Sequence, residues 1–286
     1  GVDFIALSFV QKPEDVLEAR QLIGDKAWII SKIEKPSAVK SLESIVELSN
    51  AIMVARGDLG VEMLPEEVPA IQKRIIRASR AAGKPVIVAT QMLESMISAP
   101  TPTRAEASDV ANAVYDGTDA VMLSAETASG DYPIEAVTIM DRICRQAESD
   151  PMFRSIAAAQ VIEHQHTTAD AITAAARQVA DTVEAAAIVT FTTSGATTLR
   201  AARERPSVPI LCLAPTIETA RHVSLAYGVR AVHLPGIKTF AETVEAACRI
   251  AREVGLAKKG QMLAITGGVP LGTPGGTNIL RIAEVA

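Results

Sequence analysis

The chain has 286 residues, of which 48% are hydrophobic and 21% charged, with a net charge of −5 and a pI near 5.5. This length suffices for two domains. A mildly acidic chain with 3% aromatic residues lacks the basic patch and stacking rings of a nucleic-acid binder, and no apolar run is long enough to span a membrane. Three widely spaced cysteines in apolar contexts are typical of reduced, buried thiols in a cytoplasmic protein: Cys144, Cys212 and Cys248.

In the first part of the chain, short apolar runs that end in polar residues alternate with amphipathic helical stretches. The runs predict buried parallel strands, since both faces of such strands are covered. Strands are expected near 4–8, 28–33, 51–55, 85–90 and 120–124, and helices near 13–23, 37–48, 66–82, 104–115 and 133–148. Polar residues gathered at carboxyl strand ends are typical of a (β/α)8 TIM barrel. We interpret residues 1–150 as five strands of such a barrel.

A second, smaller α/β domain is expected to cover residues 151–286, after Asp150–Pro151. It is predicted to have a mostly parallel five-stranded sheet. Its strands are expected at 187–191, 210–214, 229–234, 261–265 and 278–285, and helices at 196–205, 217–227 and 239–254 follow an opening helix from Ala169. The last strand is expected to be antiparallel, because only a Gly/Pro-rich loop precedes it.

The ends of the second and third strands carry the strongest chemical signal. Lys32 and Glu34 lie two residues apart, so they point to the same side of an extended chain. Asp58 follows the next strand. One lysine and two carboxylates at neighbouring strand ends could hold a divalent cation and an anionic substrate together. Ion pairs of the carboxylates with Lys32 or Arg56 are the alternative, and both can hold at once.

The corner that follows the third strand, residues 55–58, permits two interpretations. Gly57 allows close backbone approach, and if a short helix starts near Asp58, the free amides of both residues make an anion site. The corner could equally be a tight turn that simply needs glycine.

A family resemblance becomes visible in five ordered motifs. SKIE, MVARGDLG, ATQMLESM, PTRAE and MLSAETASGDYP resemble pyruvate kinase of the bacterial type, and FTTSGATT and GTPGGTN resemble the C-terminal domain of that family, so the resemblance covers the whole chain. It implies that the first three barrel strands and a lid domain lie upstream. The chain then looks like the C-terminal part of a longer enzyme, and the isolated 286-residue piece is expected to be inactive.

The resemblance implies a phosphotransferase of glycolysis that passes the phosphoryl group of phosphoenolpyruvate to ADP and gives pyruvate and ATP. Mg²⁺ (or Mn²⁺) would be held by Glu34 and Asp58, while Lys32 would stabilise the phosphoryl group and the enolate. K⁺ is also expected, with ligands upstream of Gly1.

The remaining site residues are assigned through the same resemblance. Substrate binding is expected from Ser8, Thr90 and the corner residues Ala55, Arg56, Gly57 and Asp58. Catalytic support is expected from Thr90, Ser124 and Glu126, although Ala125 stands where many relatives have glycine. Arg104 is expected at a subunit interface of a homotetramer.

An effector site is expected in the second domain, in a loop that connects a strand to a helix. The resemblance implies that this loop holds the phosphate of an allosteric ligand; the alternative is a plain N-cap turn. The expected residues are Thr192, Thr193, Ser194, Gly195 and Thr197. The loop Thr266–Asn278 lacks the Trp and Arg of relatives regulated by fructose 1,6-bisphosphate, so a sugar monophosphate, a nucleotide or no effector all stay open. The histidines are interpreted as structural: His164, His166, His222 and His233.

Two rival functions remain open at this point. A metal-dependent lyase or aldolase acting on pyruvate enolate also uses a Glu/Asp pair at barrel strand ends, but it does not need the second domain. The isolated chain could instead serve only as an effector-binding and oligomerisation module.

Overall fold

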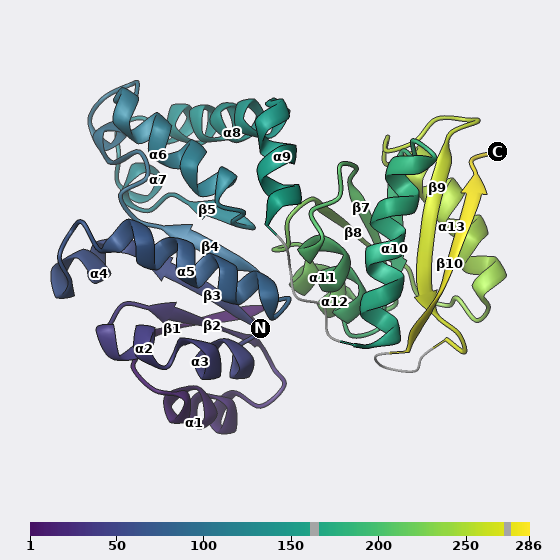
Figure 1. Ribbon diagram of the computed structural model, residues 1–286, viewed down its shortest axis with the longest axis horizontal. Helices are drawn as coiled ribbons and strands as arrows, with labels where there is room; N and C mark the ends of the chain where they lie inside the picture. Colours follow the sequence, from purple (N-terminus) through teal and green to yellow (C-terminus); the bar gives the residue numbers. More distant parts are fainter. Residues whose placement is uncertain (161–165, 272–275) are drawn as a thin grey trace. The chain divides into compact units, whose positions relative to one another are not determined.

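The chain forms two compact units, Gly1–Val161 and Ile162–Ala286, in a computed structural model that describes residues 1–160, 166–271 and 276–286 (Figure 1). Each unit has its own five-stranded sheet. Asp150–Pro151, where the sequence predicts the domain boundary, is the start of helix α9, and α9 belongs to the first unit.

The first unit is built on a parallel sheet with strand order β1-β2-β3-β4-β5, so sequential strands are neighbours. The strands are β1 (Phe4–Val10), β2 (Trp28–Ile33), β3 (Ala51–Ala55), β4 (Val86–Ala89) and β5 (Ala120–Met122). The helices are α1 (Pro13–Ile23), α2 (Pro36–Lys40), α3 (Leu42–Leu48), α4 (Arg56–Glu62), α5 (Val68–Ala81), the 3-10 helix η1 (Glu94–Ile97), α6 (Arg104–Tyr115), α7 (Ala125–Ala128), α8 (Pro133–Ser149) and α9 (Pro151–Ala159). The predicted parallel sheet with helical crossovers is confirmed.

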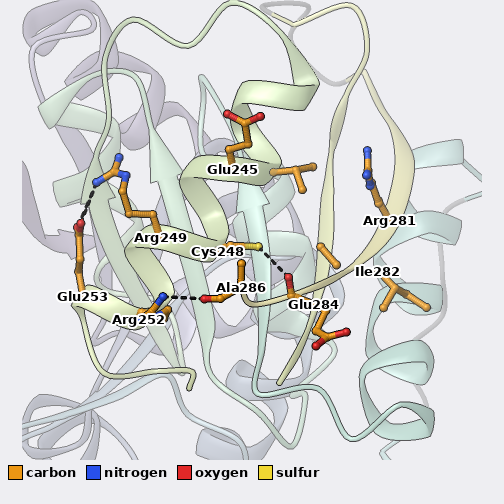
Figure 2. Close-up of a pocket in the computed structure, with 11 residues that line it drawn as sticks. Glu245, Cys248, Arg249, Arg252, Glu253, Arg281, Ile282, Glu284 and Ala286 are labelled. Carbon is orange, nitrogen blue, oxygen red and sulfur yellow. Dashed lines mark hydrogen bonds and ion pairs between the residues drawn. The ribbon is translucent and has the colours of Figure 1, made fainter. Parts of the chain in front are cut away.

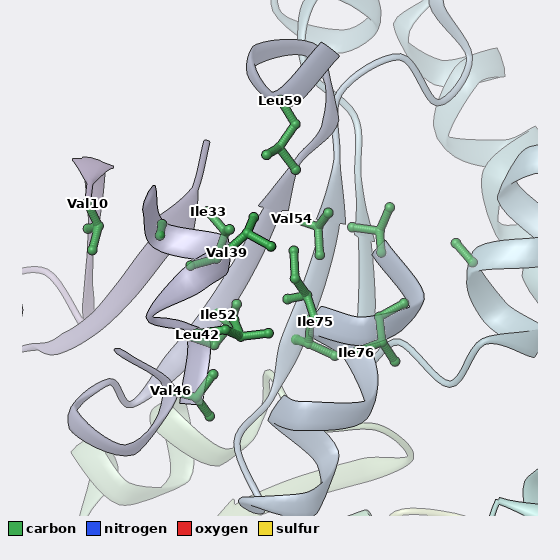
Figure 3. Packing of buried hydrophobic residues seen from close by; sticks show 14 of the residues in the cluster. Val10, Ile33, Val39, Leu42, Val46, Ile52, Val54, Leu59, Ile75 and Ile76 are labelled. Carbon is green, nitrogen blue, oxygen red and sulfur yellow. The ribbon is translucent and has the colours of Figure 1, made fainter. Parts of the chain in front are cut away.

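Residues on both faces of this sheet are buried, and one face packs on the helices. In Figure 3, Ile33, Ile52 and Val54 of the strands lie among apolar side chains of α2, α3 and α5. Residues that alternate with these, such as Ile30 and Met53, are also buried but belong to the opposite face. Each fully buried isoleucine in such a core contributes about 1.5–3 kcal/mol. Lys32 and Glu34 continue the row of Ile30, so their side chains leave the sheet away from the helices.

Three predicted helices differ from the observed ones. The helix expected at 217–227 spans only Ile217–Val223. The stretch expected as one helix at 37–48 is divided into α2 and α3 at Ser41, whose φ of −103° and ψ of 23° interrupt the helical geometry. The helix expected at 66–82 begins at Val68, and the short helix α4 precedes it. Glycines at 57 and 60 lower the helix propensity of α4, so its formation depends on tertiary contacts.

The second unit has a mixed sheet with strand order β10-β9-β6-β7-β8. Among the strands that the structure describes in this unit, only β10 and β9 pair antiparallel, which confirms the prediction for the last strand. The strands are β6 (Ala187–Phe191), β7 (Ile210–Ala214), β8 (Val229–His233), β9 (Met262–Gly268) and β10 (Thr277–Glu284). The helices are α10 (Thr168–Thr182), α11 (Ala196–Arg203), α12 (Ile217–Val223) and α13 (Phe240–Glu253).

Buried charge joins two helices of this unit. Asp170, in the first turn of α10, is 1% exposed, and its Oδ2 lies 3.2 Å from Nη2 of Arg203 at the end of α11. The same Nη2 lies 3.2 Å from Oε1 of Glu204. Removing one member of such a group leaves an uncompensated buried charge, which destabilises a fold strongly.

The three cysteines are free thiols, as predicted, but only Cys212 is fully buried. Cys144 and Cys248 are partly buried because they lie at the margins of the apolar clusters beneath α8 and α13. Burial raises the pKa of Cys144 and Cys212 to about 11. None of the helices in the described residues is both long enough and apolar enough to cross a membrane.

Candidate functional site

Lys32, Glu34 and Ser8 meet at the carboxyl ends of β1 and β2. Nζ of Lys32 lies 2.5 Å from Oε1 of Glu34 and donates a hydrogen bond to Oγ of Ser8 at 3.0 Å. Glu34 is 1% exposed, whereas Ser8 is exposed. A buried carboxylate is stable only with charged or hydrogen-bonding partners, and Lys32 is such a partner. The structure therefore brings these three predicted residues together, and the predicted ion pair between Lys32 and Glu34 is present.

Arg56 anchors the backbone that follows β4. Its guanidinium donates to the carbonyl of Thr90 at 2.8 and 3.2 Å and to the carbonyl of Gln91 at 2.8 Å. Thr90 and Gln91 have φ angles of 67° and 54°, a left-handed conformation that is costly for residues other than glycine. Nη1 of Arg56 lies 2.5 Å from Oδ2 of Asp109, which is the carboxylate partner of Arg56 among the described residues. Arg56 thus holds the strained turn in place.

Gly57 and Thr90 are in direct contact. The Gly57 amide donates a hydrogen bond to Oγ1 of Thr90 at 2.8 Å. Helix α4 starts at Arg56, close to the predicted place, but the expected free amide of Gly57 is taken by Thr90. Asp58 is exposed on the first turn of α4. A cavity of about 360 Å³ opens beside this corner, and its lining includes Gly57, Gln91 and Asp109.

Glu126 organises the end of β5. It is 3% exposed, and its carboxylate accepts hydrogen bonds from the backbone amides of Ser124 at 2.7 Å and Leu93 at 3.2 Å. The carboxylate therefore ties the loop after β5 to the segment after β4. Ser124 is partly buried and has φ −121° and ψ −102°. The substitution Ala125 is accommodated as the first residue of α7.

Glu34 and Asp58 fit a hard divalent cation by their donor chemistry. Ile33 of β2 is paired with Val54 of β3, so the next residues along the two chains, Glu34 and Ala55, lie side by side. Ala55 directly precedes α4, the helix that carries Asp58. Mg²⁺ prefers one or two carboxylates together with substrate oxygens and waters. Within the described residues, no group of three or more His, Cys, Asp or Glu side chains could enclose a metal ion. The donor set suits a cation shared with a substrate better than one held by protein alone.

Arg104 lies apart from these groups. It is exposed at the first position of α6, whose N-cap residue Thr103 forms a capping box with Glu106. Capping accounts for the start of the helix without Arg104, and a cation at a helix N-terminus has an unfavourable interaction with the helix dipole. The interface role of Arg104 stays a prediction.

In the second unit, the predicted effector loop uses several of its polar groups internally. Oγ1 of Thr192 accepts from the Gly195 amide at 3.0 Å, and Oγ1 of Thr197 bonds to Oγ1 of Thr277 at 2.6 Å. The Thr193 carbonyl accepts from Oγ1 of Thr219 at 2.8 Å. Ser194 is exposed, next to Gly195, which caps α11 with φ 87°. The side chain of Ser194 is therefore the part of this loop that faces solvent.

Figure 2 shows a separate groove of about 940 Å³ between α13 and β10. Two of its arginines are engaged within the groove: Arg249 with Glu253 at 3.0 Å, and Arg252 with the carbonyl of Ala286 at 2.6 Å. Among the described residues, none of those predicted as functional lines it. We assign no role to this groove.

Sequence reasoning missed Asp109, and it missed the contact that the Phe9 amide makes with Glu34. The Phe9 amide donates to Oε2 of Glu34 at 2.8 Å, and Asp109 holds Arg56. No local pattern marks either residue, because both contacts join segments far apart in the sequence. Of the histidines interpreted as structural, His164 lies outside the described residues, and Nε2 of His233 lies 3.2 Å from the carbonyl of Pro215.

Comparison with known proteins gives consistent matches along the chain. The models of the pyruvate kinase barrel domain and of the pyruvate kinase alpha/beta domain match residues 1–137 and 170–283. Pyruvate kinases from Agrobacterium vitis and Methylorubrum extorquens are 52% and 50% identical over 284 and 285 residues, covering 99% and 100% of this chain. A crystal structure of a pyruvate kinase from Cryptosporidium parvum matches 100% of this chain with a TM-score of 0.93 and 39% identity.

The matched proteins are longer than this chain. It covers 60% of the length of both the Agrobacterium and the Methylorubrum relatives, and 59% of the Cryptosporidium chain.

Proposed function

The chain belongs to the pyruvate kinase family, and on this premise we propose that the protein transfers the phosphoryl group of phosphoenolpyruvate to ADP, giving pyruvate and ATP. The observation that carries the proposal is the contact of the Lys32 ammonium with the buried Glu34 carboxylate at the carboxyl strand ends. Carboxyl strand ends are where barrel enzymes place their chemistry.

Lys32 supplies a point positive charge in this proposal. Phosphoryl transfer is catalysed mainly by positioning and by stabilising charge on the transferring group and the leaving oxygen. Lys32 is held between Ser8 and Glu34, which fixes the position of its ammonium. The Glu34 carboxylate offsets much of the ammonium charge, and a cation bound to the same carboxylate would reduce that offset. The same ammonium would stabilise the enolate that remains when the phosphoryl group leaves.

Glu34 and Asp58 are proposed to hold Mg²⁺ or Mn²⁺. When bound, the cation supplies positive charge to the phosphate and enolate oxygens of the substrate. A cation at Glu34 would share that carboxylate with Lys32, whose ammonium could then turn toward the substrate. K⁺ is proposed as a further requirement by analogy with the family.

The corner of residues 55–58 and Thr90 are proposed to receive the substrate carboxylate. The Gly57 amide is already bonded to Thr90, so an incoming carboxylate either uses the Asp58 amide or replaces the Thr90 hydroxyl at Gly57. The Thr90 hydroxyl also donates to the Ala89 carbonyl at 2.6 Å, so it would donate to the enolate only after turning away from that carbonyl. Ser124 and Glu126 are proposed to support proton delivery to the enolate carbon by fixing the loop after β5.

Two assignments outside the reacting centre complete the proposal. The loop of residues 192–197 is proposed to bind the phosphate of a sugar-phosphate or nucleotide effector, with Ser194 facing the ligand. Arg104 is proposed to lie at a subunit contact of a homotetramer, where a partner carboxylate would account for an exposed cation at this helix start.

The test is pyruvate formation from phosphoenolpyruvate and ADP by the protein in its full natural length, with Mg²⁺ and K⁺. Lys32→Met is the decisive variant, and removal of one such electrostatic group is expected to lower kcat by a factor of about 100 or more. The exposed Lys40→Met is the matched control. A parent protein without turnover, or a Lys32→Met variant with near-normal turnover, would rule the proposal out.

A further inference from the structure

A β-bulge lies beside the proposed metal site. Leu7 of β1 pairs with Ser31 and Val10 pairs with Ile33, so two residues of β1, Ser8 and Phe9, stand opposite one residue of β2. A bulge of this kind re-aims the groups next to it and often occurs beside active sites. Phe9 adopts a left-handed φ of 59°, which is uncommon for a residue with a bulky side chain.

The bulge fixes the orientation of the Glu34 carboxylate. Ser8 accepts a hydrogen bond from Lys32, while the Phe9 amide donates to Oε2 of Glu34 at 2.8 Å. Oε1 of Glu34 is taken by Lys32 at 2.5 Å. Each carboxylate oxygen therefore has one protein donor, and each retains acceptor capacity for a cation.

The ring of Phe9 is connected to α4 through Lys35. Nζ of Lys35 lies 5.4 Å from the centroid of the Phe9 ring and 2.6 Å from Oε1 of Glu62, the last residue of α4. A cation at this distance from a ring face is attracted to it. Asp58 lies four residues before Glu62 on α4, so the two carboxylates occupy the same face of the helix. The two proposed metal ligands are thus linked through Phe9, Lys35 and Glu62.

We propose that Phe9, Lys35 and Glu62 form a clamp that sets Glu34 and Asp58 at the spacing a divalent cation requires. The inference rests on the proposed metal role of these two carboxylates. The three clamp residues are positioning residues: Phe9 acts on Glu34 through its amide, and Glu62 acts on Asp58 through the orientation of α4. Phe9 contacts a proposed ligand directly, and partners of that kind typically change metal affinity about 10- to 100-fold.

The experiment measures Mn²⁺ binding by electron paramagnetic resonance of the free ion, with the chain at fixed concentration. Lys35→Met and Glu62→Gln are each expected to weaken Mn²⁺ binding by up to about 5-fold, as the loss of a partly exposed ion pair does. The double variant Lys35→Met/Glu62→Gln should bind Mn²⁺ as tightly as either single variant, since both substitutions break the same ion pair between Lys35 and Glu62. Lys35→Arg keeps a cation over the ring and should retain the parent affinity. Phe9→Leu keeps the amide but removes the ring that Lys35 contacts, so it should weaken Mn²⁺ binding as Lys35→Met does.

Two controls separate positioning from folding. The exposed ion pair of Arg74 with Glu43, at 3.1 Å, joins α5 to α3 away from the clamp, and Arg74→Met should not change Mn²⁺ affinity. The thermal midpoint, followed by the fluorescence of the single tryptophan, Trp28, should be alike in Lys35→Met and Arg74→Met. A midpoint that falls in proportion to Mn²⁺ affinity across the variants would show a merely structural role and would overturn the clamp.

The Glu34→Gln variant distinguishes a failure of the clamp from a failure of the metal assignment. If Glu34→Gln removes Mn²⁺ binding while the clamp variants bind like the parent chain, the clamp is wrong and the metal assignment stands. If Glu34→Gln binds Mn²⁺ like the parent, or the parent binds none, the metal assignment is overturned and the clamp with it.

Discussion

The Gly57 amide donates a hydrogen bond to the Thr90 hydroxyl over 2.8 Å and so joins the first turn of α4 to the end of β4. The same hydroxyl donates to the carbonyl of Ala89 at 2.6 Å. A Cβ atom at position 57 would lie 3.3 Å from Oγ1 of Thr90, which is tighter than ordinary contact. Glycine is therefore favoured at this position by the close approach of the Thr90 side chain.

Thr90→Val tests this contact, because valine keeps the shape of threonine but cannot accept the hydrogen bond. The Gly57 amide would lose its partner, and the free energy of unfolding should fall by about 1–2 kcal/mol. Thr90→Ser keeps the hydroxyl and should cost less. Urea unfolding of the three proteins gives the comparison. Equal stability of the valine and serine variants would mean that the hydrogen bond contributes nothing measurable.

Arg56→Met should destabilise the chain by more, about 2–4 kcal/mol, since it removes the donors that hold the carbonyls of Thr90 and Gln91. Asp109→Asn is the natural comparison. The Asp109 side chain is 40% exposed, so its ion pair with Arg56 is expected to contribute less than about 1 kcal/mol. If Asp109→Asn costs as much as Arg56→Met in urea unfolding, the ion pair dominates and our account of the turn is wrong.

The sequence predicts the strands of this chain better than its short helices. The bounds of β2 and β3 coincide with the expected ones, because continuous apolar runs flanked by polar residues are distinctive. Helix α4 contains two glycines and an exposed Val61, so neither propensity nor pattern marks it as a helix. Its position depends on Arg56 and Gly57, which contact residues more than thirty positions away.

The site, like the fold, could be predicted from the sequence only where a local pattern marks it. The two-residue period of a strand places Lys32 and Glu34 together without any further information. The bulge at Phe9 was not predictable, because nothing in phenylalanine favours a left-handed φ and the stabilising contact comes from Glu34 of another strand. The hydrogen bond from the Gly57 amide to the Thr90 hydroxyl was likewise not predictable, because it depends on how the start of α4 packs against the residue after β4.

Ser194→Asp should remove any response to a phosphate effector. Ser194 is exposed next to the N-cap of α11, and a carboxylate there would repel the ligand phosphate. The concentration of ligand for half-maximal binding should rise about 10-fold or more, equivalent to at least about 1.4 kcal/mol. Calorimetric titration with a sugar monophosphate and with a nucleoside monophosphate provides the measurement.

Ser194→Asn is the matched control, since it introduces a similar volume without charge. It should bind the effector more tightly than the aspartate variant. Stability should not fall in Ser194→Asp, because a negative charge near a helix N-terminus is favourable. An unchanged titration in Ser194→Asp would show that the effector binds elsewhere or that none exists.

Glu106 should give the first unit a pH-dependent component of stability. Its carboxylate accepts hydrogen bonds from the Ser95 amide at 2.7 Å, the Ser95 hydroxyl at 2.5 Å and the Thr103 amide at 2.7 Å. Burial raises the pKa of Glu106, but these hydrogen bonds outweigh it and hold the pKa below its usual value of 4.5. The unfolded chain therefore binds this proton more readily than the folded chain does.

The sign of the effect follows from that difference. The stabilisation by ionised Glu106 is complete above the unfolded pKa of 4.5 and is lost as the pH falls through the lower folded pKa. Glu106→Gln should thus cost about 1 kcal/mol at neutral pH, as the loss of a capping interaction does, and the difference from the parent should shrink below pH 4.5. Urea unfolding between neutral and acidic pH measures it, with the exposed Glu94→Gln as control. A difference that stays constant at every pH would show that the cap does not depend on the charge of Glu106.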